Sequence, residues 1–381
     1  MHNSTSSLSV KELENLLTEG RFPITPKSEQ KKFIRDPISR DIVVFCPERD
    51  QIPANITELQ TTLAQTKDKS QSCRICEGKT TKIEGVKRTG QDTFTFYNKN
   101  PFPALSRTGI ENILPDSSEP TKKLVGENYL LWVSNEHKDI HQLSHKEHQA
   151  CFELLAELEG ELHGTGFVYI FKNTGAEAGA SQEHGHYQIE FLNTLPRIIE
   201  ENKKFAMTFN KSRVAHWLDS TPKELEVKDY ENARIIIPPF MKTPWRAIIL
   251  AKTNHPDKML NLRGCMEDGG IQDLAAATSD MAYALSLLMP ARGFPLSYKL
   301  IFHTQHTHLG RTGQMYIEVI PLLQKMGGSE EGGVYFPKDS PQKASERYRR
   351  CFDNYIFGRE EDSSQPSSNE VFKNCIAPLL N

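Results

Sequence analysis

A run of small residues followed by alternating polar residues is the sequence feature that most restricts the fold. Residues 173–188 read Asn-Thr-Gly-Ala-Glu-Ala-Gly-Ala-Ser-Gln-Glu-His-Gly-His-Tyr-Gln. Alternate residues of a β-strand share one face, so we expect His184, His186 and Gln188 to lie side by side. The small residues before them allow close approach of a ligand to backbone amides that can meet an anion. The segment predicts a functional site, although a half-buried strand with a solvated polar face would show the same His-x-His spacing.

The composition describes an ordinary globular protein and argues against some classes of partner. The chain has 381 residues, with 37% hydrophobic and 25% charged residues and a net charge of -3. This length favours two domains or an internally duplicated fold. The small net charge gives no electrostatic reason to expect nucleic acid or an anionic membrane as a partner. Any phosphate chemistry is therefore expected to be local.

The sequence carries no pattern of membrane insertion or secretion. No apolar run approaches the length of about 20 residues that spans a bilayer, and the first seven residues lack the basic and then apolar order of a signal peptide. The seven cysteines are scattered, except for Cys73 and Cys76. An odd, scattered set favours reduced thiols, so we expect a cytoplasmic protein.

The order of the expected elements suggests one fold used twice. Residues 1–30 are polar and are expected to form an N-terminal extension. Each half of the remaining chain shows strands, then a helix, then a pair of strands. Strands are expected at 33–49, 129–133, 166–172, 233–239, 245–252, 298–302 and 314–321, and helices at 146–163, at 273–289 and in a segment that ends at 350.

Cys73 and Cys76 have the spacing with which two thiolates on a tight turn bind one zinc ion. The sequence has no second Cys-x-x-Cys pair, so the other ligands would be histidines. His137, at the end of an expected strand, and His184 are the best-placed candidates. Two ordinary thiols are the alternative. Three further histidines compete for the third position, of which the last two are expected to face solvent: His141, His145 and His148.

His186 is the candidate nucleophile. A neutral imidazole can displace a phosphate leaving group and hold the nucleotidyl unit as a phosphoramidate. Such a histidine needs a fixed tautomer, which a backbone carbonyl on the other ring nitrogen usually sets. Gln188, Ser181 and the amides of the loop would then stabilise the charged phosphoryl oxygens.

These residues resemble the galactose-1-phosphate uridylyltransferase family, the nucleotidyltransferase branch of the histidine triad superfamily. Its members carry an Asn, a Gly-rich run, a Ser and then His-x-His-x-Gln at the spacing found here. The Asp36-Pro37 turn, the cysteine pair, the segment 100–104 and His137 also fall in family order. The resemblance covers most of residues 33–325, and the end of the chain, from Gly332 to Pro341, is more like the ADP-sugar phosphorylase branch.

The resemblance implies an α+β fold, a duplicated histidine-triad-like fold with antiparallel sheets and flanking helices. A catalytic domain with a zinc site would span 31–195, and a second histidine-triad-like domain 196–381. The implied activity is a ping-pong nucleotidyl transfer between a nucleoside diphosphate sugar and a sugar 1-phosphate or phosphate, in a homodimer. The implied site residues are His186 as nucleophile, Gln188 on the transferred phosphoryl group, Asn173, Ser181 and Arg35 near the phosphates, and Cys73, Cys76, His137 and His184 on zinc.

The chain departs from the family at several positions. Tyr187 follows His186 where the family has a small residue, and we expect it on the opposite strand face. Uridylyltransferases carry a His-x-His for a second metal in a late strand, whereas residues 314–321 contain no histidine, so we expect no second metal. Three nearby histidines could rebuild such a site, but a solvated loop is the favoured expectation for them: His303, His306 and His308.

Two other functions are compatible with the same motifs. Histidine triad hydrolases place a third histidine where Gln188 stands, and that histidine protonates a poor leaving group. A sugar phosphate leaves without this proton, so Gln188 favours transfer. A zinc-stabilised nucleotide-binding protein without catalysis is the third reading, and the intact His186 argues against it.

Overall fold

The computed structural model describes twelve ranges of the chain. Residues 34–381 form one compact unit, and the expected extension at 1–30 lies outside the described residues. The described ranges are 34–36, 41–44, 73, 96–100, 126–134, 136–162, 167–180, 182–192, 195–252, 261–304, 314–356 and 366–379.

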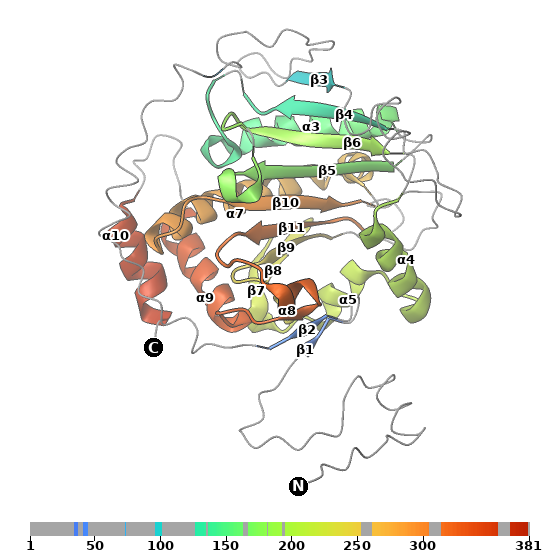
Figure 1. Ribbon diagram of the computed structural model, residues 1–381. Helices are drawn as coiled ribbons and strands as arrows, with labels where there is room; N and C mark the ends of the chain where they lie inside the picture. The colour runs from blue at the N-terminus through green and yellow to red at the C-terminus, as the bar shows by residue number, and fades with distance from the viewer. Residues whose placement is uncertain are drawn as a thin grey trace, which may run out of the picture. The chain divides into compact units, whose positions relative to one another are not determined.

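A nine-stranded antiparallel sheet organises the described residues (Figure 1). Its strand order is β3-β4-β6-β5-β10-β11-β9-β8-β7, and every neighbouring pair is antiparallel. The expectation of an antiparallel α+β fold is therefore confirmed. In spatial order the strands are Phe96–Asn100, Gly126–Trp132, His186–Leu192, Phe167–Thr174, Tyr298–His303, Tyr316–Pro321, Ala247–Ala251, Ala233–Ile236 and Glu226–Asp229.

The strand order reveals the duplication. From the edge inward the first half runs β3-β4-β6-β5. The second half has an additional edge strand, β7, and then runs β8-β9-β11-β10, so the four inner strands repeat the order of the first half, and the halves meet where β5 pairs with β10. A long helix lies between corresponding strands in each half, α3 (His145–Leu162) between β4 and β5, and α7 (Ile271–Ala291) between β9 and β10. The predicted boundary between residues 195 and 196 falls after β6 and stays a prediction, because the halves share one continuous sheet.

The two faces of the sheet are buried by different elements. Ile235 and Ile249 belong to the larger hydrophobic cluster, together with residues of α3 and α7. Their neighbours Ile236 and Ile248 belong to a second cluster with Trp217 of helix α5 (Arg213–Ser220). This period of two is the pattern of strands covered on both faces. We call the face covered by α3 and α7 the helix face and the other the site face.

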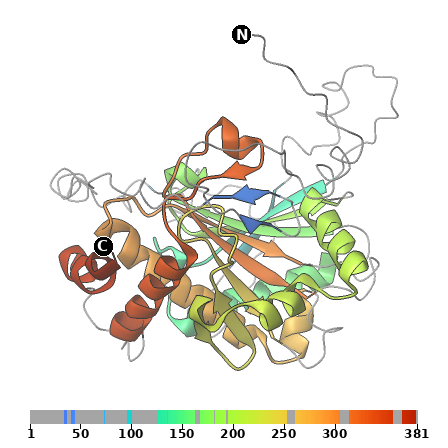
Figure 2. The same cartoon turned by 90° about the horizontal axis from the view of Figure 1, so that it is seen from below.

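The site face also carries a small three-stranded sheet. Its order is β1-β2-β12, with strands Ile34–Arg35, Ile42–Val43 and Val334–Tyr335. Val43 packs into the cluster that contains Trp217. Seen from below, the small sheet and helix α8 (Gly328–Glu331) lie on the opposite side of the large sheet from α7 and α9 (Pro341–Cys351) (Figure 2).

The sequence predicted α3, α7 and α9 but missed the other helices. Among these are α4 (Arg197–Phe209) and α5, whose short apolar stripes are interrupted by charged residues. Ser212 caps α5, since its hydroxyl accepts a hydrogen bond from Ala215 N–H at 3.0 Å. None of the described helices is long and apolar enough to cross a membrane. The remaining helices are α6 (Leu262–Glu267), α10 (Ser368–Val371), 3-10 turns at Ile140–Gln142, Ala176–Ala178, Lys223–Leu225 and Ala377–Leu379, and π-helical turns at Phe352–Ile356 and Phe372–Ile376.

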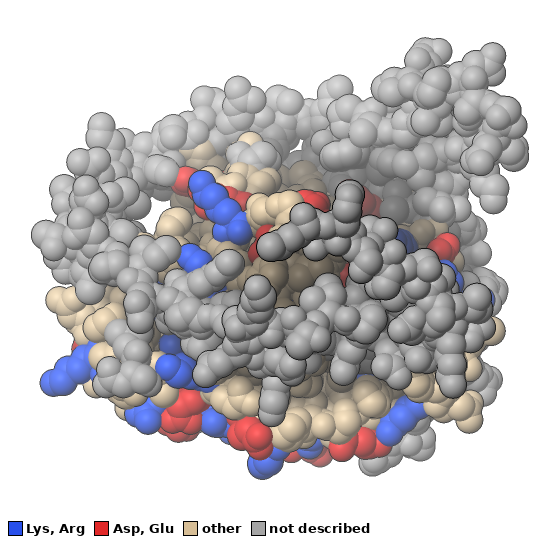
Figure 3. Space-filling model, turned by 60° about the horizontal axis from the view of Figure 1, so that its bottom comes forward, with Lys and Arg blue, Asp and Glu red and all other residues tan. Residues whose placement is uncertain are grey.

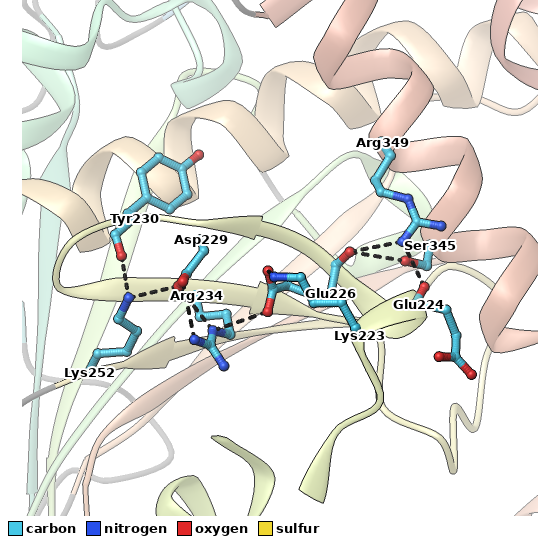
Figure 4. A network of polar contacts seen from close by, with 9 residues as sticks. All are labelled: Lys223, Glu224, Glu226, Asp229, Tyr230, Arg234, Lys252, Ser345 and Arg349. Atoms are coloured by element: carbon cyan, nitrogen blue, oxygen red, sulfur yellow. Dashed lines mark hydrogen bonds and ion pairs between the residues drawn. The ribbon is translucent and has the colours of Figure 1, made fainter. Parts of the chain in front are cut away.

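Charged side chains close the edge of the sheet at β7 (Figure 4). Arg234 donates to both carboxylate oxygens of Asp229, at 3.0 and 3.1 Å. Arg349 of α9 donates to the backbone carbonyl of Glu226 at 3.1 Å. The pairing register of β7 with β8 shifts between Glu226 and Lys228, which marks a β-bulge or irregularity. A bulged edge strand whose carbonyls are already bonded is a poor template for another strand.

Candidate functional site

The segment 173–188 folds as a strand, a short loop and the beginning of a second strand. β5 ends at Thr174, and Gly175 turns the chain with a φ of 80°. A β-carbon at Gly175 would lie 2.3 Å from the carbonyl oxygen of Leu296, so only glycine fits. β6 begins at His186. His184 therefore lies just before the strand, where the sequence reading had placed it within the strand.

His186 is held in one tautomer. Its side chain is buried, and Nδ1 lies 2.9 Å from the backbone carbonyl oxygen of His184. A carbonyl can only accept, so Nδ1 carries the hydrogen and Nε2 keeps its lone pair. Burial lowers the pKa of His186 below its ordinary value. The imidazole is therefore neutral near pH 7, with one nitrogen ready to attack.

Gln188 and Asn173 occupy positions on the same face as His186. Gln188 follows two residues later in β6 and is half-buried. It pairs with Phe171 of β5, and Asn173, two residues later in β5, lies on the same face of the sheet as Phe171. The sheet thus gathers three of the predicted site residues.

Tyr187 points to the helix face, as predicted. It is fully buried, and its hydroxyl lies 2.8 Å from Nε2 of His148 on α3. The expectation that His148 faces solvent is wrong, because the inner side of α3 packs on this face of the sheet. His145, by contrast, has a side chain that is 61% exposed and is bonded to Asp280 at 2.7 Å.

A cluster of metal-binding side chains lies at the start of β6. The ligand atoms of Cys73, His137 and His184 all lie within 4.8 Å of one another. Nε2 of His184 donates to the carbonyl of Ser134 at 2.8 Å, so Nδ1 is the unprotonated nitrogen, and it lies 3.7 Å from the sulfur of Cys73. A thiol and unprotonated imidazole nitrogens fit a zinc-type site. Cys76 lies outside the described residues.

The loop that carries His137 is fastened to the site by residues that the sequence reading missed. The backbone amide of Gly185 donates to the carbonyl of Lys138 at 2.9 Å. A β-carbon at Gly185 would lie 2.6 Å from Oδ1 of Asp139. Asp139 in turn forms a buried ion pair with Lys172 of β5, at 2.6 Å. Lys172, a lysine directly after the apolar run of this strand, was the sequence feature that could have indicated a buried ion pair.

Several predicted residues cannot be located or have other partners. Ser181 and the side chain of Arg35 lie outside the described residues, as do His306 and His308. His303 is buried, and its Nε2 lies 3.0 Å from a carboxylate oxygen of Glu318. The prediction that it lies in a solvated loop is wrong, because it ends β10 under the cover of the site face.

Comparison with known proteins supports the fold. An ADP-glucose phosphorylase from Arabidopsis thaliana is 23% identical over 347 residues, which is 82% of this chain and 92% of that protein. The crystal structure of an ADP-glucose phosphorylase from the same plant, with bound ADP-glucose, superposes with a TM-score of 0.64 at 18% identity. It covers 84% of this chain and 99% of that chain. The fold is that of the uridylyltransferase family.

Other solved structures support the same fold. A GalT-like protein from Arabidopsis thaliana matches with a TM-score of 0.63 at 17% identity, over 84% of this chain and 99% of that chain. A uridylyltransferase matches with a TM-score of 0.58 at 17% identity, over 84% and 98% of the two chains. No family model matches the sequence. The predicted resemblance, including that to ADP-sugar phosphorylases, is confirmed.

Proposed function

We propose that the protein is a nucleotidyltransferase that acts on a nucleoside diphosphate sugar and on a sugar 1-phosphate or inorganic phosphate. The similar proteins are an ADP-glucose phosphorylase and a uridylyltransferase, both enzymes of this type. ADP-glucose is bound in one of the similar structures, so an ADP-sugar is the first substrate to test.

The fixed tautomer of His186 carries the proposal. Nε2 attacks the α-phosphorus of the nucleotide sugar, a P–N bond forms, and the P–O bond to the sugar 1-phosphate breaks. In the second half-reaction a phosphate oxygen of the acceptor attacks the same phosphorus, the P–N bond breaks, and His186 returns to its neutral form. The hydrogen bond from Nδ1–H to the carbonyl of His184, at 2.9 Å, stabilises the positive charge that develops on the ring during attack.

Gln188 favours transfer over hydrolysis. Its amide would donate to a phosphoryl oxygen, with Asn173, Ser181 and Arg35 as further phosphate contacts. A glutamine cannot protonate a leaving group, but a sugar phosphate is a stable anion and leaves without that proton. The same reasoning disfavours a hydrolase that must expel a poor leaving group.

Zinc would brace this site from the adjoining loop. We propose Cys73, Cys76, His137 and His184 as its ligands, a tetrahedral set of the structural kind. Because His184 also offers its backbone carbonyl to His186, a bound ion would fix the ring that carries the chemistry. The ion supplies rigidity, and the chain's own residues bind and transfer the nucleotide.

Covalent labelling tests the mechanism. The full chain is incubated with ADP-, UDP- and GDP-sugars labelled at the α-phosphorus, and the protein is assayed for an acid-labile, base-stable label. We expect His186→Ala to abolish the label and His145→Gln, a change at an exposed histidine, to retain it. A wild-type protein that no nucleotide labels, or an equal label on His186→Ala, would overturn the covalent mechanism.

Metal analysis tests the zinc site separately. We expect about one zinc per chain in the wild type and a loss of most of it in Cys73→Ser. Cys265→Ala, which changes a buried thiol on α6, should keep the metal. Unchanged zinc in Cys73→Ser would refute the assignment.

A further inference from the structure

A second cavity lies on the site face, in the other half of the sheet. Its volume is about 200 Å³, and Tyr169, Ile301, Glu318, Trp217 and Phe240 are among the residues that line it. β11, which carries Glu318, is separated from β6 by β5 and β10. Three strand spacings amount to about 14 Å. Tyr169 lies on β5, next to β6, but it pairs with Glu190, which is four residues and about 13 Å along the strand from His186. The cavity is therefore distinct from the surroundings of His186.

Most charges in the cavity have partners. Lys242 forms ion pairs with Asp36 at 2.8 Å and with Asp41 at 2.6 Å. Arg246 pairs with Glu318 at 2.8 Å. Although burial opposes its charge, Arg246 and His303 hold the pKa of Glu318 well below its ordinary value. The charges of these lining residues therefore neutralise one another.

Arg213, the first residue of α5, is different. The residue is 7% exposed and lines the cavity. Nη1 donates to the hydroxyl of Tyr316 at 2.9 Å, and the guanidinium lies 5.6 Å from the centre of the Trp217 ring. Among the described residues no carboxylate forms an ion pair with it, and its Nε and Nη2 are buried without a hydrogen-bond partner.

These two nitrogens lie on the same edge of the guanidinium group. Their N–H bonds are parallel, which is the arrangement that binds two oxygens of a carboxylate or a phosphate at once. A buried cation without a counter-ion is costly, and a bound anion removes that cost. The unused edge of Arg213 therefore has the form of an oxyanion site. Less than 1 Å² of either nitrogen is exposed, so a ligand in the cavity would reach them by displacing a neighbouring side chain.

Other residues that line the cavity indicate which further groups a ligand would contain. Trp217 and Phe240, with ring centres 5.9 Å apart, provide an apolar surface. Glu201 of α4 is bonded to Arg197 through one carboxylate oxygen, while its other oxygen is buried without a partner among the described residues. That oxygen can accept a hydrogen bond from a hydroxyl group.

We propose that this cavity binds a small hydroxylated oxyanion, a phosphate ester or a carboxylate, through the Nε–Nη2 edge of Arg213. The site occupies the second-half counterpart of the position that His186 and Gln188 hold in the first half, since β11 corresponds to β6. It sits beside Tyr169, whose strand pairs with β6 at Glu190. The proposal is independent of the nucleotidyl transfer assigned to His186.

Charged residues of both signs are interspersed over the described surface seen in Figure 3. The described residues of this face therefore present no large patch of positive charge, and we expect binding to depend on contacts inside the cavity. The difference in oxyanion affinity between wild type and variants of Arg213 should therefore persist at physiological ionic strength, where surface charges are largely screened.

Tryptophan fluorescence separates the two sites. Trp132 lies 4.9 Å from His186, whereas Trp217 lines the second cavity. Inorganic phosphate, glucose 1-phosphate and gluconate are titrated into the full chain. We expect at least one probe to change the emission of Trp132→Phe saturably. A response of Trp217→Phe to phosphate or to glucose 1-phosphate would report the acceptor site beside His186, near Trp132. If no probe changes the emission of Trp132→Phe, or if the response disappears only in that variant, the proposal fails.

Variants of Arg213 test the contact itself. By calorimetry, Arg213→Met should weaken binding at this site about tenfold or more, because two charge-assisted hydrogen bonds are lost. Arg213→Lys, which keeps the charge but not the paired edge, should also weaken it. Arg197→Met, on the exposed side of Glu201, should bind within about threefold of wild type. Undiminished binding by Arg213→Lys or Arg213→Met would overturn the proposal.

Thermal unfolding distinguishes a ligand site from a structural arginine. Methionine removes an uncompensated buried charge, so the ligand-free Tm of Arg213→Met should equal or exceed that of wild type. A lower ligand-free Tm together with unchanged oxyanion binding would assign Arg213 to stability alone. Labelling of His186 by a nucleotide sugar should survive in Arg213→Met, so failure of either proposal is recognised separately.

Discussion

Replacing Asp139 by asparagine should destabilise the fold by leaving a buried lysine without its counter-ion. Asp139 accepts hydrogen bonds from the amide of Ile140 at 2.7 Å and the hydroxyl of Thr174 at 3.1 Å, besides its 2.6 Å ion pair with Lys172. Lys172 is 1% exposed, so water cannot replace the lost charge. Breaking such a pair from one side costs about 3–5 kcal/mol.

Thermal and chemical unfolding of the full chain measure this cost. In a unit of this size that free energy corresponds to a fall in Tm of about 4–7 °C. Lys172→Met should also destabilise, and the double variant should lose less than the sum of the two, with a coupling of about 1–3 kcal/mol. A loss below about 1 kcal/mol in Asp139→Asn, or additive single changes, would show that the pair does not hold the loop that carries His137.

Three further outcomes follow from single residues. Burial raises the pKa of Glu159 to about 7 from an ordinary value of 4.5, so its contribution to stability is present below pH 4.5 and is lost as the pH rises through 7. Denaturant unfolding should therefore find Glu159→Gln more stable than wild type at pH 8, by about 2–3 kcal/mol, and not at pH 4; an equal difference at both values would contradict the burial argument. Gly185→Ala should lower the free energy of unfolding by about 1–3 kcal/mol, because its new methyl group meets Asp139, and should reduce nucleotide labelling of His186. A variant with wild-type Tm and labelling would show that the loop accommodates the methyl group without cost. Chelation of the metal should lower the Tm of wild type but not that of Cys73→Ser, which scanning calorimetry can compare directly.

Local periodicity let the sequence predict the elements and the central motif. The alternation of His186, Tyr187 and Gln188 placed the first and third on one face and the second in the core, because strand geometry fixes that alternation whatever the rest of the chain does. The long helices α3 and α7 were found for the same reason, since their apolar residues repeat at helical spacing. The short helices α4 and α5 lack such a long stripe and were missed.

Contacts between distant residues had no signature in the sequence. Asp139 and Lys172 lie 33 positions apart, and each was unremarkable until the loop and β5 met. His148 lies near the beginning of a helix, a position that predicted an exposed side chain. The packing of α3 on the sheet instead buries this side chain against Tyr187.

The sequence by itself determined the residues available for chemistry: a histidine and a glutamine two residues apart, and cysteine and histidine side chains of the types that can bind a metal. These depend on residue type and on the period of one strand. Only the tertiary structure decided that the two halves form one continuous sheet, that His186 is held as the Nδ1–H tautomer, and that Arg213 is buried beside Tyr316, 103 residues away, without an anionic partner among the described residues. Burial and charge compensation depend on which distant residues surround a group, and folding alone sets that.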